Sequence, residues 1–367
     1  MPSDTMPREP APSEQRFTLT EIQPQSPAES FAQEVRAGLT ASPKRLACRF
    51  FYDDEGSALF EQICDLPEYY VTRAEREILQ TYADEIVAQM PVVNTLVELG
   101  SGSASKTRLL IEALLRRQDT LRYVPIDISR GMLEASAPEL LADYPGLRID
   151  AVAAEYDDGL RALAATAKTD ASMANTASTA VATDHGPKLL LWLGSNIGNF
   201  ERAAAAAFLQ RVGETMTPDD RLLVGIDLRK DRVVLEPAYD DAQGVTGRFN
   251  KNLLVRINRE LDGHFDPDLF DHRAVYDEQA GRVEMYLVSR DEQTVSIDAL
   301  PLRVRFTSAE PVHTENSYKY SPEEIASLAD AAGFEVERRW LDTAGRFSEN
   351  LLRPIARPGK RNENPAP

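Results

Sequence analysis

A glycine-rich turn follows an apolar run in the stretch VELGSGSASKTRLL, residues 97–110. Turns of this kind present backbone N–H groups to a ligand at the start of a helix, and phosphate-binding versions read GxGxxG, GxxxxGKS or GxxxxGKT. Neither pattern fits, because Ser105 stands where a third glycine belongs and no glycine precedes Lys106. Glu98 is expected beside the ligand, where its carboxylate repels a polyphosphate and attracts a cation. The turn therefore indicates a cationic or zwitterionic ligand such as S-adenosylmethionine (SAM), with a purely structural tight turn as the alternative.

The next two apolar runs end in groups that suit the adenosine part of such a ligand. Asp127 ends the run YVPIDI, where a carboxylate reaches ribose hydroxyls. The alternative is a helix cap, a role for which Ser129 is the better candidate. After the run IDAVAAEY, Glu155 is placed to accept from an adenine amino group and Tyr156 to stack on the base. An ordinary strand end is the alternative for this last pair.

A fourth run opens into LWLGSNIGNF, residues 191–200, which carries uncharged hydrogen-bonding groups. Gly194 allows close approach of the backbone, and Asn199 can bind a substrate carboxylate without a fixed charge. A turn that uses Asn and Gly for their backbone freedom is the alternative. A metal site would need carboxylates or histidines, and this stretch has neither. No GxSxG elbow or Cys/His pair indicates covalent catalysis, so the chemistry is expected to come from the cofactor.

These groups must be held by elements that bring the ends of several strands together. Near-continuous apolar runs (TLVEL, YVPIDI, IDAVAAEY, KLLLWLG, RLLVGIDL) alternate with amphipathic helical patterns. This alternation predicts an α/β fold with a parallel sheet covered on both faces, and ligands bind at the carboxyl ends of such strands. The run FNKNLLVRINREL predicts a long helix, and RVEMYLVSR and LPLRVRF predict strands of an inserted subdomain. The C-terminal region reads as a helix followed by two strands.

The composition changes along the chain and indicates its organisation. Both ends are rich in Pro and polar residues and read as disordered, and a small, polar stretch without periodicity reads as a surface insertion. The predicted parts are a tail (1–25), a helical part of the substrate subdomain (26–75), a SAM-binding core (76–229) with the insertion (168–185), the substrate subdomain (230–318), core-completing elements (319–356) and a second tail (357–367).

Charge and cysteine content limit the class of function. The 367 residues carry a net charge of −18, which argues against a nucleic-acid backbone or an anionic membrane as partner and favours a small-molecule substrate. Cys48 and Cys64 are too few for a disulfide scaffold, so a reduced cytoplasm is the expected location. No signal peptide or membrane-spanning run is apparent. The four histidines, which lack metal-ligand spacing and read as surface or core residues, are His185, His264, His272 and His313.

Taken together, the motifs resemble those of the SAM-dependent histidine Nα-methyltransferases of ergothioneine biosynthesis. The resemblance runs from about residue 29 to 353 and is most specific in the paired signature FYDDEGSALFEQI and LPEYY. Further matching stretches are LVELGSGSASKTRLL, PIDISRGML, LWLGSNIGNF, AYDDAQGVTGRFNKNLLVRINREL, RVEMYL and HTENSYKYSPEEI. The resemblance implies a Rossmann-like class I SAM-dependent methyltransferase core with a second, inserted substrate-binding subdomain. The expected oligomeric state is a monomer.

The resemblance also implies roles for individual residues. The residues implied to hold SAM are Gly100, Gly102, Lys106, Asp127, Glu155 and Tyr156, with Tyr52 near the methionine moiety. Family members usually carry Asp where this chain has Glu155, and the longer acid can still accept from adenine. The implied catalytic residues are Tyr52, Asn199 and Tyr239.

The substrate side of the site is implied in the same way. Asn199 and Tyr239 match the residues that hold the amino acid's carboxylate and amine, and Glu315 and Ser317 match those that recognise the imidazole. Further lining positions are Tyr69, Gly194, Met285 and Phe60. Residues two apart in an extended segment point to the same side, so Glu315 and Ser317 can act together.

The implied reaction is three methyl transfers from SAM to the α-nitrogen of histidine. Alternatives are the same chemistry on another amino acid such as tryptophan, and a SAM-binding protein without turnover. An NAD-dependent oxidoreductase is disfavoured by the missing third glycine.

Overall fold

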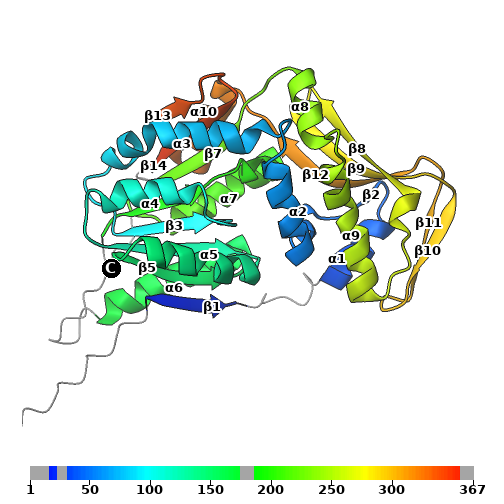
Figure 1. The fold of residues 1–367 in the computed structure, drawn as a ribbon, viewed down its shortest axis with the longest axis horizontal. Helices are drawn as coiled ribbons and strands as arrows, with labels where there is room; N and C mark the ends of the chain where they lie inside the picture. The colour runs from blue at the N-terminus through cyan, green and yellow to red at the C-terminus, as the bar shows by residue number, and fades with distance from the viewer. Residues whose placement is uncertain (1–15, 23–30, 174–185, 356–367) are drawn as a thin grey trace, which may run out of the picture.

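The structure, a computed structural model, describes residues 16–22, 31–173 and 186–355. Its larger part is an eight-stranded sheet in the order β1-β5-β4-β3-β6-β7-β14-β13 (Figure 1). The strands are β1 (Phe17–Glu21), β3 (Thr95–Leu99), β4 (Leu121–Asp127), β5 (Leu147–Ala153), β6 (Lys188–Trp192), β7 (Arg221–Asp227), β13 (Phe334–Leu341) and β14 (Phe347–Pro354). All pairings from β1 to β7 are parallel, whereas β14 runs antiparallel to both β7 and β13. The predicted parallel α/β core is confirmed.

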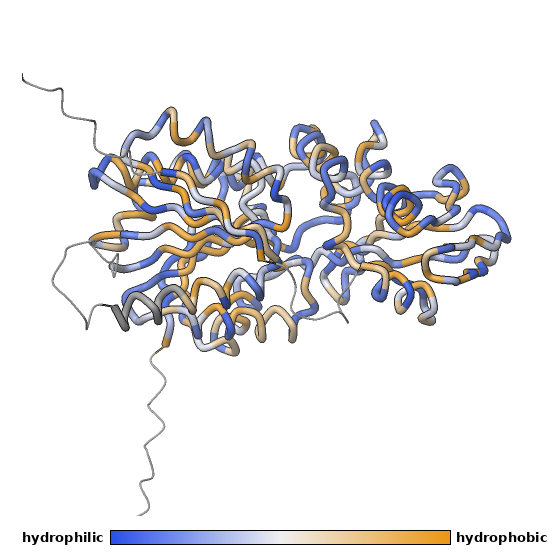
Figure 2. The backbone as a smooth tube through the Cα atoms, turned by 90° about the horizontal axis from the view of Figure 1, so that it is seen from below, coloured by the Kyte–Doolittle hydropathy of each residue, from blue (hydrophilic) through white to orange (hydrophobic). Residues whose placement is uncertain are grey.

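Helices cover both faces of this sheet, which explains why its central strands are apolar along their whole length. The helices of the core are α3 (Tyr70–Ala88), α4 (Thr107–Leu115), α5 (Arg130–Asp143), α6 (Tyr156–Met173), α7 (Arg202–Glu214) and α10 (Pro322–Ala332). Within β3, Leu96 packs with the residues of α3, α4 and α5, while Val97 and Leu99 pack with those of α6, α7 and α10. Figure 2 shows the hydrophobic strands lying between these helical layers.

A smaller lobe lies beside the carboxyl ends of the central strands (Figure 1). Its four-stranded sheet has the order β2-β12-β9-β8, with β10 and β11 forming a separate hairpin. The strands are β2 (Lys44–Arg45), β8 (Phe270–Asp277), β9 (Arg282–Ser289), β10 (Gln293–Ile297), β11 (Leu302–Phe306) and β12 (Pro311–Tyr318). The helices are α1 (Phe31–Thr40), α2 (Asp54–Cys64), α8 (Arg232–Tyr239) and α9 (Val245–Leu261), together with the 3₁₀ turns η2 (Cys48–Phe51) and η4 (Pro267–Leu269). A further 3₁₀ turn, η3 (Asn196–Asn199), follows β6 of the core and contacts both β7 and β12. The N-terminal helix α2 packs on α9 and so joins this lobe.

Three predicted boundaries differ from the structure. The tail predicted for residues 1–25 is wrong at Phe17–Glu21, which form β1 at the sheet edge because Phe17 and Leu19 alternate toward the core. The predicted boundary at residue 75 falls inside α3, a helix that packs on the core strand β14. The insertion predicted to start at residue 168 is helical up to Met173, the end of α6. Residues 1–15, 23–30, 174–185 and 356–367, where the remaining tail and insertion predictions fall, lie outside the described residues.

Candidate active site

Apart from Tyr52, which follows η2, the predicted cofactor residues lie at or just after the carboxyl ends of β3, β4 and β5. Gly100 and Gly102 follow β3 with φ of +74° and +49°, in the left-handed region that favours glycine. The Asp127 carboxylate accepts hydrogen bonds from the backbone N–H groups of Gly102 and Ser129, both at 2.8 Å. The Ser129 side chain caps α5, as its sequence position suggested. Because Ser129 fills the capping role, the carboxylate of Asp127 is held against the glycine turn.

The surroundings of this turn fit the adenosine part of SAM. A side chain at Gly102 would meet no atom within 4 Å, whereas one at Gly100 would approach the Tyr156 hydroxyl to 2.6 Å. The turn is therefore open at one glycine and bordered by an aromatic ring at the other. Glu155 lies at the end of the next strand and pairs with Arg49 at 3.5 Å. Two carboxylates beside an open turn supply acceptors, which suit hydroxyl and amino donors better than phosphate.

The prediction that Glu98 faces the ligand is wrong. Its side chain is 2% exposed, and its carboxylate accepts from the hydroxyls of Thr107, at 2.6 Å, and Tyr123. Burial raises the pKa of Glu98 to about 7, with these two hydrogen bonds opposing the shift. Side chains alternate along β3, and that of Glu98 points into the core. Its hydrogen bond with Thr107 therefore holds the first turn of α4 against β3.

Lys106 connects the glycine turn to the turn after β6. Its ammonium pairs with Glu75, a fully buried residue of α3. The other carboxylate oxygen of Glu75 accepts from the backbone N–H of Gly194 at 2.6 Å. Gly194 has a φ of +74°, and a side chain there would lie 3.5 Å from the Lys106 ammonium. The predicted cofactor edge and the Gly194 turn are thus held side by side.

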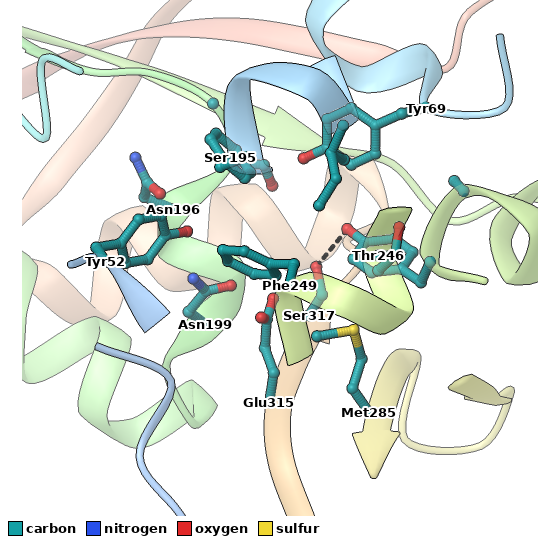
Figure 3. Close-up of a pocket in the computed structure, with 15 residues that line it drawn as sticks. Tyr52, Tyr69, Ser195, Asn196, Asn199, Thr246, Phe249, Met285, Glu315 and Ser317 are labelled. Carbon is teal, nitrogen blue, oxygen red and sulfur yellow. Dashed lines mark hydrogen bonds between the residues drawn. The ribbon is translucent and has the colours of Figure 1, made fainter. Parts of the chain in front are cut away.

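A pocket of about 490 Å³, partly open to solvent, lies between the two lobes (Figure 3). Its lining residues are Tyr52, Phe60, Ile63, Tyr69, Gly194, Ser195, Asn196, Asn199, Ala238, Tyr239, Thr246, Phe249, Met285, Glu315 and Ser317. Every residue predicted for the substrate lines this one pocket, although these residues come from six separate elements or turns of the chain.

Several lining residues were not predicted. Ile63 lies on α2, Ala238 on α8, and Thr246 and Phe249 one turn apart on α9. The predicted helix began at Phe249, whereas α9 begins at Val245, where Asp241 accepts from the first two backbone N–H groups at 3.0 and 2.7 Å. An acid just before an apolar helical pattern is a helix-start signal, and it could have revealed this extra turn.

One wall of the pocket is aromatic. The ring of Phe60 lies 5.7 Å from that of Tyr52, 6.3 Å from that of Tyr69 and 6.0 Å from that of Phe249. Tyr69 continues the wall to Tyr239, at 6.2 Å. Burial, followed by nearby Glu315, raises the pKa of Tyr52 well above its ordinary value. The wall therefore presents neutral rings, whose faces attract a cationic nitrogen.

The adjoining wall, which begins at Tyr239, is polar and rests on a buried lysine. The hydroxyls of Tyr239 and Ser317 lie 2.8 Å apart, and Lys319 donates to each of them at 2.7 Å. His272 supports the same wall, since its Nε2–H donates to the Tyr239 carbonyl at 2.8 Å while its Nδ1 accepts from Asn250 at 2.9 Å. His272 thus serves a structural role in the lobe that carries Tyr239.

Glu315 is the acid of the polar wall. It lies on β12 opposite Met285 of β9, and its carboxylate faces the pocket near Ser317 (Figure 3). Burial raises the pKa of Glu315 to about 7, and Lys319 partly opposes this shift. Among the described residues no donor satisfies the carboxylate, so it is available to a ligand N–H.

We expect Glu315→Gln to stabilise the ligand-free protein selectively at high pH. A raised pKa means that the folded state binds the proton more tightly, so ionisation of Glu315 costs stability increasingly between pH 4.5 and about 7. Gln cannot ionise and escapes this cost. Relative to wild type, the variant should gain about 1–3 kcal/mol in unfolding free energy between pH 5 and pH 8. Urea unfolding at both pH values measures the gain, and an equal difference at both would contradict the expectation.

The sheet order and the site together define a class of protein. A central parallel sheet with a final antiparallel strand inserted next to β7, a glycine turn after β3 and an acid ending β4 are the features of a class I SAM-dependent methyltransferase. The chain matches the family described as "Histidine-specific methyltransferase, SAM-dependent" over residues 31–354, and it belongs to that family.

Relatives agree with this membership. The chain is 41% identical over 326 residues to the histidine N-alpha-methyltransferase of Mycolicibacterium smegmatis, covering 89% of this chain and 95% of that protein. Identity to the histidine N-alpha-methyltransferase of Mycobacterium tuberculosis is 40% over 319 residues, covering 87% and 93%. It is also 27% identical over 314 residues to ergothioneine biosynthesis protein 1 of Schizosaccharomyces pombe, covering 84% of this chain and 39% of that protein.

Proposed function

We propose that this chain transfers methyl groups from SAM to the α-amino nitrogen of L-histidine, giving Nα,Nα,Nα-trimethylhistidine. The observation that carries the proposal is the open carboxylate of Glu315 beside Ser317, in a pocket adjoining the glycine turns. An acid and a hydroxyl on one strand face suit the two nitrogens of an imidazole ring. The names of the two mycobacterial relatives support the same substrate and the same nitrogen.

The polar groups of the pocket orient the amino acid. Asn199 and Tyr239 hold the carboxylate, while Glu315 accepts a ring N–H and Ser317 bonds the other ring nitrogen. This arrangement directs the α-nitrogen toward the turn at Gly194, the side on which the cofactor residues lie. Methyl transfer moves the positive charge from the sulfonium to the α-nitrogen and creates no new charge. The main contribution of the site is therefore to hold the α-nitrogen in line with the methyl group.

The nitrogen must lose its proton before each transfer. SAM supplies a methyl group on a positively charged sulfonium when it is bound. Burial of the substrate ammonium among the aromatic rings, next to a like charge, lowers its pKa. The Tyr52 hydroxyl, whose own pKa is raised, does not hold the proton but relays it toward water. As methyl groups accumulate, the faces of Tyr52, Tyr69 and Phe60 stabilise the growing apolar cation.

The proposal extends to the pathway, the oligomeric state and the cellular location of the protein. The name of the fission-yeast relative supports a place for the product in ergothioneine biosynthesis. The net charge of −18 and two free cysteines favour a monomer acting on a small molecule in the cytoplasm. No helix in the described part of the chain is long and apolar enough to cross a bilayer.

The direct test supplies the protein with SAM and each of a panel of amino acids and follows the products by mass. Histidine should gain up to three methyl groups, while phenylalanine and tryptophan remain unchanged. If tryptophan is methylated in preference to histidine, the assignment of histidine as the substrate is wrong. If the protein binds SAM but methylates no amino acid of the panel, it is a SAM-binding protein without turnover.

We expect Asn199→Ala to weaken histidine binding about 10-fold or more, because a hydrogen bond to a charged carboxylate is lost. Affinity for S-adenosylhomocysteine should change less than about 2-fold. Tyr239→Phe should act on the same ligand more mildly. Calorimetry with each ligand measures both effects, and Asn316→Ala is the control, since its amide lies outside the lining and donates to Glu201 at 2.9 Å. Parallel loss of both ligands in Asn199→Ala would mean that Asn199 only shapes the turn.

A further inference from the structure

The substrate pocket has an unusual charge balance for a site that binds an amino acid. Its fifteen lining residues include the carboxylate of Glu315 but no lysine or arginine. An amino-acid carboxylate brought into this pocket would therefore meet no positively charged lining residue. Burying a carboxylate without a compensating charge is costly, so the positive charge must come from behind the lining.

Lys319 lies directly behind the lining. It is fully buried, and its ammonium donates to the hydroxyls of Tyr239 and Ser317, both at 2.7 Å. Its third partner is the carboxylate of Asp227, at 2.8 Å. All three ammonium hydrogens are thus used, two of them on groups that face the substrate. Burial disfavours the charged form, but Asp227 and Tyr239 outweigh this effect and raise the pKa of Lys319 above its ordinary value.

The charge of Lys319 is not fully cancelled by Asp227. The same carboxylate pairs with Lys230 on its other side and accepts from the Tyr70 hydroxyl at 2.7 Å. Burial lowers the pKa of Lys230 to about 8, which leaves it largely protonated at pH 7. In the Lys319–Asp227–Lys230 cluster two lysines therefore share one carboxylate, so Asp227 alone does not neutralise the charge of Lys319 next to the pocket.

The hydrogen bonds of Lys319 also fix the direction of the hydroxyl hydrogens. Because both hydroxyl oxygens accept from Lys319, neither Tyr239 nor Ser317 can donate to it. Either hydroxyl can donate across the 2.8 Å between the two oxygens. When the Ser317 hydrogen forms this bridge, the Tyr239 hydrogen remains for the substrate carboxylate, and the Ser317 oxygen can still accept from a ring N–H. A hydroxyl that accepts from a cation is a stronger donor to an anion.

We infer that Lys319 is a positioning residue that supplies, through the Tyr239 hydroxyl, the counter-charge for the carboxylate of the substrate. It thereby makes a carboxylate next to the amine a requirement for tight binding. The inference rests on the proposed function, because it takes histidine as the amino acid in the pocket. It adds a buried residue, outside the lining, that selects amino acids over amines.

Histamine provides the matching probe, since it keeps the ring and the amine of histidine but lacks the carboxylate. Calorimetry in the presence of S-adenosylhomocysteine gives Kd for both compounds in wild type, Lys319→Met and Lys230→Met. Lys319→Met should raise Kd for histidine by about 30-fold or more and Kd for histamine by less than about 3-fold. Lys230→Met removes an equal charge from the far side of Asp227. It should change the ratio of Kd for histidine to Kd for histamine at least ten times less than Lys319→Met does.

The outcomes separate the inference from the proposed function. If wild type does not bind histidine, the proposed function fails. If wild type binds histidine but Lys319→Met weakens both compounds equally, Lys319 is only structural and the inference is overturned. An equal change in the histidine-to-histamine Kd ratio in Lys319→Met and Lys230→Met would also overturn the inference. Should Lys319→Met not fold, the same ratio is measured in the Lys319→Met, Asp227→Asn double variant, which leaves no buried carboxylate unpaired.

Discussion

Replacing Glu315 by leucine should abolish most of the preference for histidine over phenylalanine in kcat/KM, which we expect to be about 10⁴-fold in wild type, since a site built on hydrogen bonds discriminates far more strongly than an apolar one. The carboxylate faces the pocket without a donor of its own, so an aromatic ring lacking an N–H leaves a charge unpaired in wild type. In Glu315→Leu that penalty disappears. The acceptance of phenylalanine relative to histidine should therefore rise while the turnover of histidine falls.

The measurement is kcat/KM for histidine, phenylalanine and tryptophan with SAM saturating. Glu310→Leu is the control, because Glu310 precedes the same strand but pairs with Lys44 away from the pocket. This control should keep the wild-type preference for histidine. If Glu315→Leu also keeps it, Glu315 does not recognise the ring, and the assignment of histidine as substrate fails before that of a methyltransferase.

Asp127→Ala should weaken binding of SAM and S-adenosylhomocysteine by about 10- to 150-fold, the loss expected for hydrogen bonds from ribose to a charged group. Asp127 is positioned for this role by the backbone N–H groups of Gly102 and Ser129, which leave its oxygens with further acceptor capacity. Histidine binding should be affected only where it depends on the cofactor. Calorimetry with S-adenosylhomocysteine gives the affinity directly.

Ser129→Ala is the matched control for this prediction. Ser129 caps α5 by accepting from the Met132 N–H at 3.3 Å, so its loss should reduce stability by about 1 kcal/mol without a comparable loss of cofactor affinity. A folded Asp127→Ala variant with unchanged affinity would show that Asp127 only shapes the turn.

The core was predictable from the sequence because its signal is local. Strands such as β3 and β6 are buried on both faces and therefore read as continuous apolar runs. β1 was missed because it is only five residues long and lies in a polar stretch. Only two of its side chains point inward, so its sequence resembles that of a disordered tail. The orientation of Glu98 was missed because a strand position does not reveal which face the ligand occupies, and here the acid turns toward Thr107 and Tyr123.

The pocket residues were predictable from the family motifs and not from the hydrophobic periodicity that predicts the core. Tyr69, Asn199 and Ser317 come together only through the packing of the two lobes, which no local rule shows. Lys319 stands in the quoted stretch HTENSYKYSPEEI, and alternation from Glu315 through Ser317 places it on the same strand face. Its role was missed because that role depends on Asp227, a residue of a different strand and lobe.

The two predicted sites differ in how they are distributed along the chain. Except for Tyr52, the predicted cofactor residues lie between Gly100 and Tyr156, whereas the pocket draws on residues from Tyr52 to Ser317. Changes in β9 and β12 can therefore alter which side chain is accepted without altering cofactor use. Grafting these strands from a relative with another substrate onto this core is a rational route to new methylated amino acids. Lys319 should be retained in such chimeras, since the carboxylate is common to them all.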